Sequence, residues 1–144
     1  MNQKENVMKA LNVKSTQIFE SLYQLAKEDG HIRIDNNPSF MPVSVEIIQI
    51  TDIGDVVSVA HYGEQNGDLM SDPEMTFLRT PKGNVVPMSY CNHYLGVYRE
   101  SVRITERIED GKQQVTYNPV RQAEHAQFAN KWMRNIKEQQ NLEV

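Results

Sequence analysis

The sequence contains a single cysteine and no long hydrophobic run. Because Cys91 stands alone, no internal disulfide can form, which favours a reducing compartment. No apolar segment approaches the roughly 20 residues that cross a bilayer, and the polar residues 1–6 lack the apolar core of a signal peptide. These absences predict a cytoplasmic protein without a membrane segment. Free cysteines are usually buried, so we interpret Cys91 as a small core residue rather than a reactive thiol.

The sequence also lacks an excess of basic residues. It has 15 lysines and arginines against 19 aspartates and glutamates, which gives a formal net charge of −4 at pH 7. Nucleic acids attract basic surfaces through their phosphates, so this balance opposes non-specific binding to DNA or RNA. Lys131, Arg134 and Lys137 lie toward the end of a predicted helix, where cations suit the helix dipole, and we interpret them as a solvated face.

The motifs of familiar cofactor and metal sites are missing too. We find no internal repeat, no low-complexity segment and no glycine-rich phosphate loop. There is no His-Glu-x-x-His, no paired Cys-x-x-Cys and no calcium-binding loop. No cofactor is therefore assigned from the sequence.

The composition that is present is typical of a soluble globular domain. Of 144 residues, 39% are hydrophobic and 24% are charged, far from the values of disordered chains. Two domains of half this length would each bury too little core to offset their conformational entropy. We therefore expect one domain over residues 1–144.

Hydrophobic periodicity predicts two amphipathic helices. Apolar residues recur at spacings of three and four over 16–29, and Gly30 ends this segment. Asn118-Pro119 is typical of a helix start, with asparagine as the cap and proline in the first turn, and a long helix to about Gln139 follows. A weaker pattern favours a short helix over 3–11.

Alternating apolar residues between the two helices predict strands. These cover residues 31–34, 43–50, 56–62, 74–79, 84–90, 94–98 and 101–108. We expect either a bulge near Ile47 or a strand covered on both faces, and Pro87 favours an edge or a bulge. The hairpin dipeptide Asp110-Gly111 would place Ile104 opposite Tyr117. The fold class is α+β: a mainly antiparallel sheet of about five to seven strands, packed by an N-terminal and a long C-terminal helix.

Residues 61–77 form the most polar connection between two predicted strands. Asn66-Gly67 favours a tight turn, and we expect Leu69 and Met70 to be buried and to hold the segment against the sheet. Acidic and hydroxyl side chains here either bond to local backbone amides or bind a ligand, since loops on rigid sheets often carry sites. His61 continues an apolar column, which is more typical of a hydrogen-bonded core histidine than of a ligand.

Candidate binding residues come from this segment and from the tyrosine-rich segment 90–98, whose rings and hydroxyls could line a pocket. They are His61, Tyr62, Glu64, Asn66, Asp68, Asp72, Glu74, Tyr90 and His93. Imidazole and carboxylate groups are also ligands of zinc, manganese and iron. The candidate metal ligands are His61, Asp68, Asp72 and Glu74. The spacing matches no nuclease template, because Thr76 stands where such a site would have a lysine.

A longer motif runs through the middle half of the chain. It consists of Ala60-His61-Tyr62, the run from Glu64 to Met70, the run from Asp72 to Met75 and Phe77, and it continues in Pro87, Tyr90, Asn92 and Leu95 to Tyr98. In these residues the chain resembles an uncharacterised bacterial domain family associated with mobile genetic elements. The chain departs from that family's pattern at His93, where the family has an acid. The resemblance groups the polar residues of 61–74 as a unit but implies no established activity.

These observations predict a small cytoplasmic binding or accessory domain without catalysis of its own, with a polar site around residues 61–77. The alternative is a metal-dependent hydrolase, acting for example on phosphodiesters, that uses the His/Asp/Glu cluster. A third reading is an interaction protein whose edge strand or C-terminal helix pairs with a protein partner or a second copy. The sequence names neither the ligand nor the oligomeric state.

Overall fold

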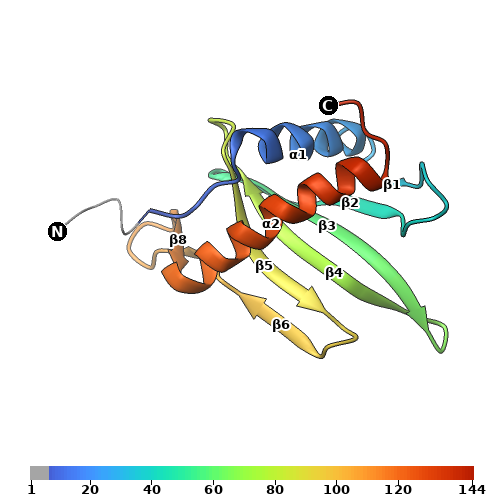
Figure 1. Ribbon diagram of the computed structural model, residues 1–144. Helices are drawn as coiled ribbons and strands as arrows, with labels where there is room; N and C mark the ends of the chain where they lie inside the picture. Colours follow the sequence, from blue (N-terminus) through green and yellow to red (C-terminus); the bar gives the residue numbers. More distant parts are fainter. Residues whose placement is uncertain (1–6) are drawn as a thin grey trace.

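A computed structural model of the protein describes residues 7–144, and this part of the chain contains two helices and eight strands (Figure 1). The elements are α1 (Val13–Ala26), β1 (His31–Ile34), β2 (Val43–Thr51), β3 (Gly54–Gln65), β4 (Asp68–Arg79), β5 (Val85–Asn92), β6 (Val97–Glu100), β7 (Val102–Glu106), β8 (Gln113–Tyr117) and α2 (Pro119–Gln139). The predicted α+β class is confirmed.

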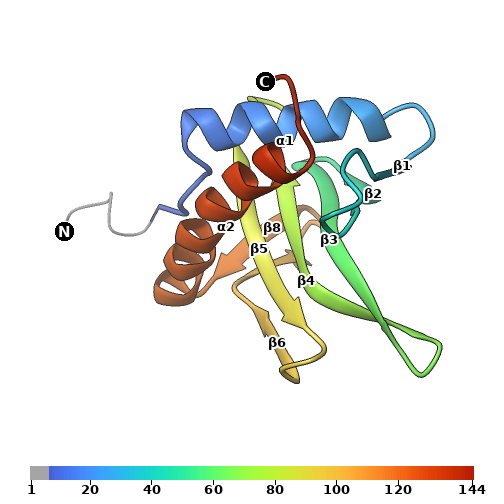
Figure 2. The same cartoon turned by 45° about the vertical axis from the view of Figure 1, so that its right-hand side comes forward.

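The strands form a six-stranded sheet and a separate two-stranded ribbon. Strands β1 to β6 lie in sequence order and each pairs antiparallel with the next, while β7 pairs with β8. Short connections between neighbours explain this order. In Figure 2 both helices lie on one side of the sheet and β8 lies behind it. The two faces of the sheet are therefore covered differently.

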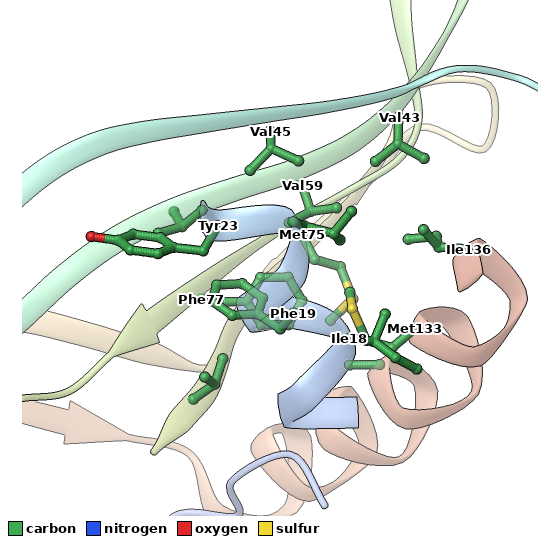
Figure 3. Packing of buried hydrophobic residues seen from close by; sticks show 14 of the residues in the cluster. Ile18, Phe19, Tyr23, Val43, Val45, Val59, Met75, Phe77, Met133 and Ile136 are labelled. Carbon is green, nitrogen blue, oxygen red and sulfur yellow. The ribbon is translucent and has the colours of Figure 1, made fainter. Parts of the chain in front are cut away.

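The face under the helices carries the main hydrophobic core. Side chains of α1 and α2 meet those of the central strands there (Figure 3). The rings of Phe19 on α1 and Phe77 on β4 lie 5.2 Å apart between their centroids, and Met133 on α2 is fully buried beside them. This contact fixes both helices on one face, which we call the helix face.

The opposite face, here called the open face, is only partly covered. The ribbon β7–β8 packs against it through a smaller core of Val56, Leu78, Val86, Met88 and Val102. Side chains alternate along a strand, so β3 directs Val57, Val59 and His61 to the helix face and Ser58 and Tyr62 to the open face. The polar residues Ser58 and Tyr62 of β3 therefore lie on the open face.

Both helices are capped by asparagine. The Asn118 side chain accepts a hydrogen bond from the Arg121 amide and Pro119 occupies the first turn, as predicted. Helix α1 begins at Val13 rather than residue 16, because Asn12 provides the cap through the Ser15 amide. The short helix expected over 3–11 is not present in residues 7–11, and residues 3–6 lie outside the described part.

The polar connection 61–77 is a long hairpin arm rather than an irregular turn. Gln65 pairs with Asp68, and Asn66 and Gly67 form the tip with positive φ angles of 52° and 85°. Beyond Ala60 the arm no longer pairs with β2, and its tip extends past the helices (Figure 1). The expected burial of Leu69 is therefore wrong, since this side chain is 69% exposed.

The predictions of strand register have different outcomes. The bulge near Ile47 is present between Ile47 and Gln49, and the pairing of β4 with β5 also shifts beside Pro87. The expected pairing of Ile104 with Tyr117 is wrong, because Ile104 lies opposite Val115. The turn is longer than the dipeptide predicts: the Arg107 amide donates to the Lys112 carbonyl across residues 108–111.

Candidate functional site

A cavity of about 520 Å³ lies on the open face beside the ribbon. Its polar lining includes Glu74, Thr76, Ser89, Cys91, Tyr98 and Glu100. Its apolar lining includes Val56, Met88, Val102 and Ile104, which belong to or border the smaller core. A volume of this size is typical of sites for small molecules.

Glu74 is the central polar group of this cavity. The Ser58 hydroxyl donates to its Oε2 at 2.7 Å, and the Ser71 hydroxyl donates to its Oε1 at 3.1 Å. Both serines are buried, whereas Glu74 is half-buried. None of the ion pairs found in residues 7–144 includes Glu74. Its negative charge is therefore stabilised by hydroxyl groups and not by an ion pair with a basic side chain.

The Tyr62 hydroxyl and the Cys91 thiol, both close to Glu74, stay protonated at neutral pH. Burial first, and then the Glu74 charge, raises the pKa of the Tyr62 hydroxyl. The same two causes raise the pKa of the Cys91 thiol, against a smaller opposite effect of the Ser71 hydroxyl. Because the thiolate is the nucleophilic form of cysteine, the protonated Cys91 thiol is a poor nucleophile at neutral pH. Its predicted burial is confirmed by an exposed fraction of 8%.

The remaining polar groups of the cavity are largely paired with one another. The hydroxyls of Thr76 and Ser89 lie 2.5 Å apart, and Arg103 forms an ion pair with Glu100 at 2.8 Å. The His93 ring accepts the Ser71 amide at Nδ1, so a neutral ring carries its proton on Nε2. These bonds fix the shape of the cavity wall. Among the carboxylates of the wall, Glu100 has an ion-pair partner and Glu74 does not.

Tyr62, Glu74 and His93 are the predicted site residues that the structure gathers on the open face. Glu74 and His93 line the cavity, and Tyr62 lies in the adjoining hollow with Ser58. Asp72 accepts a hydrogen bond from the Asn92 side chain at 3.2 Å, which links β4 to β5. Asp72 therefore has a structural partner of its own.

His61 and Tyr90 lie on the helix face instead. The His61 ring is 5% exposed, meets the Trp132 ring edge-on at 5.6 Å and bonds through Nδ1 to the Pro42 carbonyl at 3.0 Å. A carbonyl can only accept, so Nδ1 carries the hydrogen. Tyr90 packs edge-on against Phe128 of α2 at 5.2 Å. The sheet separates both residues from Glu74.

Glu64, Asn66 and Asp68 are exposed at the tip of the hairpin arm. The four candidate metal ligands thus lie apart: His61 on the helix face, Asp68 at the hairpin tip, Asp72 beside Asn92 and Glu74 in the cavity. Within the described residues, no three His, Cys, Asp or Glu side chains are grouped closely enough to hold a metal ion. The geometry does not assemble the set that the sequence indicated for a metal.

Sequence reasoning missed the small polar residues Ser58, Ser71, Thr76 and Ser89. Ser58 stands between Val57 and Val59, and Thr76 stands between Met75 and Phe77. A polar residue between apolar ones in a strand indicates a polar second face. The same period of two in adjacent strands could have located the open face, but not the cavity wall that the ribbon provides.

No helix within residues 7–144 is long and apolar enough to cross a membrane. Comparisons with curated proteins and with solved structures found no match. A protein-family model, described as a domain of unknown function (DUF6908), matches residues 13–142. This range includes both helices and the whole sheet. The protein therefore belongs to the DUF6908 family of domains of unknown function.

Proposed function

We propose that the protein is a binding domain without catalysis of its own, and that the cavity on the open face is its binding site. One observation carries this proposal: the half-buried Glu74 carboxylate, fixed by Ser58 and Ser71, faces a cavity of about 520 Å³. A preformed cavity with a few fixed polar groups and one apolar wall is typical of a ligand site.

The chemistry around Glu74 favours binding over reaction. The raised pKa of Cys91 keeps its thiol protonated, and the Ser71 hydroxyl is engaged as a donor to Glu74. An activated nucleophile requires an adjacent base aligned to take its proton. His93 uses Nδ1 as an acceptor for the Ser71 amide, so this nitrogen is not available as a base.

The proposed site differs from the polar segment that the sequence favoured. It retains Glu74, Tyr62 and His93 from residues 61–77 and 90–98, and it adds Ser58 and Ser89. Metal-dependent hydrolysis has less support, because His61, Asp68 and Asp72 lie apart from Glu74. The residues of the hairpin tip are left outside the site.

A cytoplasmic location and an association with bacterial mobile elements are also proposed. The lone, buried Cys91 supports the first, because secreted domains of this size often use disulfides. The sequence resemblance in residues 60–77 supports the second. Fractionation of cells that express the full chain, followed by immunoblotting, tests the location.

The binding site can be tested by NMR with ¹⁵N-labelled protein and a fragment library of cationic, neutral and anionic compounds. We expect saturable shifts in the amide signals of Ser58, Thr76, Ser89 and Cys91. The variant Ser89→Phe fills the cavity and should lose these shifts. Thr116→Phe, on an exposed position of β8, is the matched control and should keep them.

Two results would contradict the proposal. One is a library that perturbs other surfaces but leaves the cavity amides unchanged. The other is turnover of a model ester or phosphodiester that Glu74→Gln abolishes, since a binding domain has no such activity. Circular dichroism of each variant confirms that its fold is retained.

A further inference from the structure

The Glu74 carboxylate has hydrogen-bonding capacity that the protein does not use. An ionised carboxylate offers about four acceptor positions; Ser58 and Ser71 occupy one on each oxygen, and the nearby Tyr62 hydroxyl can use a third. A half-buried charge is stabilised by an opposite charge more than by hydroxyl groups alone. The ion pairs of the described residues leave Glu74 without such a charge. A cationic donor from a ligand would complete this site.

The other charges of the cavity do not supply that cation. Arg103 is the basic residue of the wall, and it is paired with Glu100 at 2.8 Å. The wall formed by Glu74, Glu100 and Arg103 therefore carries a net negative charge. Consistent with this, the charge of Glu74 contributes to the raised pKa values of Tyr62, Cys91 and Tyr98, for each of which burial is the largest cause.

Part of the cavity lining is apolar. Val56, Met88, Val102 and Ile104 line the cavity where the ribbon meets the sheet. A bare inorganic cation would leave this wall in contact with water, whereas an alkyl chain would cover it. Each buried methylene contributes about 0.8 kcal/mol, which corresponds to about fourfold in affinity.

On this basis we infer that the cavity binds a small organic cation, with an ammonium or guanidinium group at Glu74 and an alkyl part against Val56, Met88 and Ile104. The inference rests on the proposed function and specifies the chemical class of the ligand. The cavity volume of about 520 Å³ favours a free small molecule over a protein segment.

The test is an NMR titration of the ¹⁵N-labelled full chain at an ionic strength of about 0.15 M. The probes are n-butylamine, n-hexylamine and n-hexylguanidine, with n-hexanol and hexanoate as matched uncharged and anionic compounds. We expect saturable shifts at Ser58, Ser71 and Cys91 with the cations only. Affinity should rise by about fourfold for each methylene from butyl to hexyl.

Two variants separate the Glu74 contact from general attraction to an acidic protein. Glu74→Gln keeps the shape of the side chain and should lower the affinity for hexylamine by about tenfold or more, since it removes a charge-assisted bond. Asp68→Asn makes the same change in net charge at the exposed hairpin tip and should leave the affinity unchanged. Thermal melts confirm that both variants fold.

The possible failures are distinguishable. If neutral or anionic fragments shift the cavity amides and the amines do not, the ligand class is wrong while the binding site stands. If a lysine-containing peptide saturates these amides and free amines do not, a partner protein occupies the cavity and the inference is wrong. Equal affinities of the wild type and Glu74→Gln would also overturn it.

Discussion

At the scale of single residues, His125 on α2 is held neutral by its surroundings. The Ser101 hydroxyl donates to the Met88 carbonyl at 3.0 Å, so His125 Nδ1 donates to Ser101 Oγ, 2.7 Å away. Burial, and then the positive charge of Arg121, lowers the pKa of His125, while Glu124 has a smaller opposite effect. A proton on this ring therefore favours the unfolded chain.

The lowered pKa predicts that acid destabilises the protein through His125. The unfolded histidine titrates near pH 6.5, so below that pH the unfolded state binds more protons and the free energy of unfolding decreases. His125→Gln should remove this part of the pH dependence. Urea unfolding at several pH values measures it: the stability advantage of the wild type should shrink from pH 7.5 to 5.5. A constant difference would contradict the assignment.

Gly54, at the start of β3, has a backbone conformation that other residues avoid. Its φ is 143°, and a methyl group there would collide with the Arg79 carbonyl of β4. Gly54→Ala should lower the free energy of unfolding by on the order of 2 kcal/mol or more. Gly30→Ala is the control, since φ is 83° but no atom lies within 4 Å. Chemical denaturation compares the two, and equal losses would show that the Arg79 contact is unimportant.

At the scale of elements, α1 is joined to the sheet by Arg79. Its guanidinium donates to both Glu20 oxygens, at 2.7 and 3.0 Å, and lies 4.0 Å from the centre of the Tyr23 ring. The Tyr23 hydroxyl in turn donates to Asp55 at 2.8 Å. This network connects one helix to two strands.

Replacement of Arg79 should show how much its bidentate contact with Glu20 contributes to stability. Lysine keeps the charge but cannot form the bidentate contact or stack as well on Tyr23, so Arg79→Lys should cost about 1–2 kcal/mol of unfolding free energy. Arg134→Lys, on an exposed position of α2, should cost almost nothing. Urea unfolding measures both variants. If the loss persists when Glu20 is already glutamine, the ion pair is not its cause.

Both ends of α2 hold neighbouring chain segments through buried amide side chains. Gln122 bonds to the amide and the carbonyl of Lys9, at 2.7 and 2.8 Å. Gln140 is fully buried, accepts from the Asn36 amide at 2.8 Å and donates to the Met41 carbonyl at 3.0 Å. The helix therefore orders connections that have little regular structure.

Gln140→Leu should release the loop between β1 and β2. The amide of Asn36 and the carbonyl of Met41 would lose their partners, at a cost of about 1–3 kcal/mol. Hydrogen exchange at Asn36 should become faster. Gln127→Leu, at an exposed position of the same helix, is the control. Unchanged exchange at Asn36 would mean that other contacts order this loop.

At the scale of the whole molecule, the two faces of the sheet differ in stability. The helix face has the large core around Phe19, Phe77 and Met133, whereas the ribbon rests on a smaller one. Elements with few buried contacts open locally before the protein unfolds. Native-state hydrogen exchange should therefore give lower opening free energies for β7–β8 than for β3–β4. Equal values would indicate a single cooperative unit.

The sequence predicted the layers of this fold better than its site. The period of the apolar residues identified both helices and an antiparallel sheet, and Asn118-Pro119 located the start of α2. The hairpin arm was predicted as a turn because residues 61–72 are rich in polar side chains, although they form two strands that pair with each other. Strand pairing overrode that local preference.

The cavity could not be predicted, because it depends on how the ribbon returns to the sheet. A single residue, Ser101, separates β6 from β7, and its amide and hydroxyl both donate to the Met88 carbonyl. This contact directs β7 across the open face. Ser101 lies between two apolar-alternating segments and has no sequence feature that indicates such a change of direction. Glu74 was predicted as a site residue, but not its serine partners.

The unequal covering of the two faces also separates the main hydrophobic core from the cavity proposed as the binding site. The ribbon supplies one wall of the cavity, while both helices pack on the other side of the sheet. Substitutions at Val102 or Ile104 therefore reshape the cavity without touching the helices. For the binding site proposed above, exchange of a few ribbon side chains would therefore change the length of ligand that fits, while the main core stays intact.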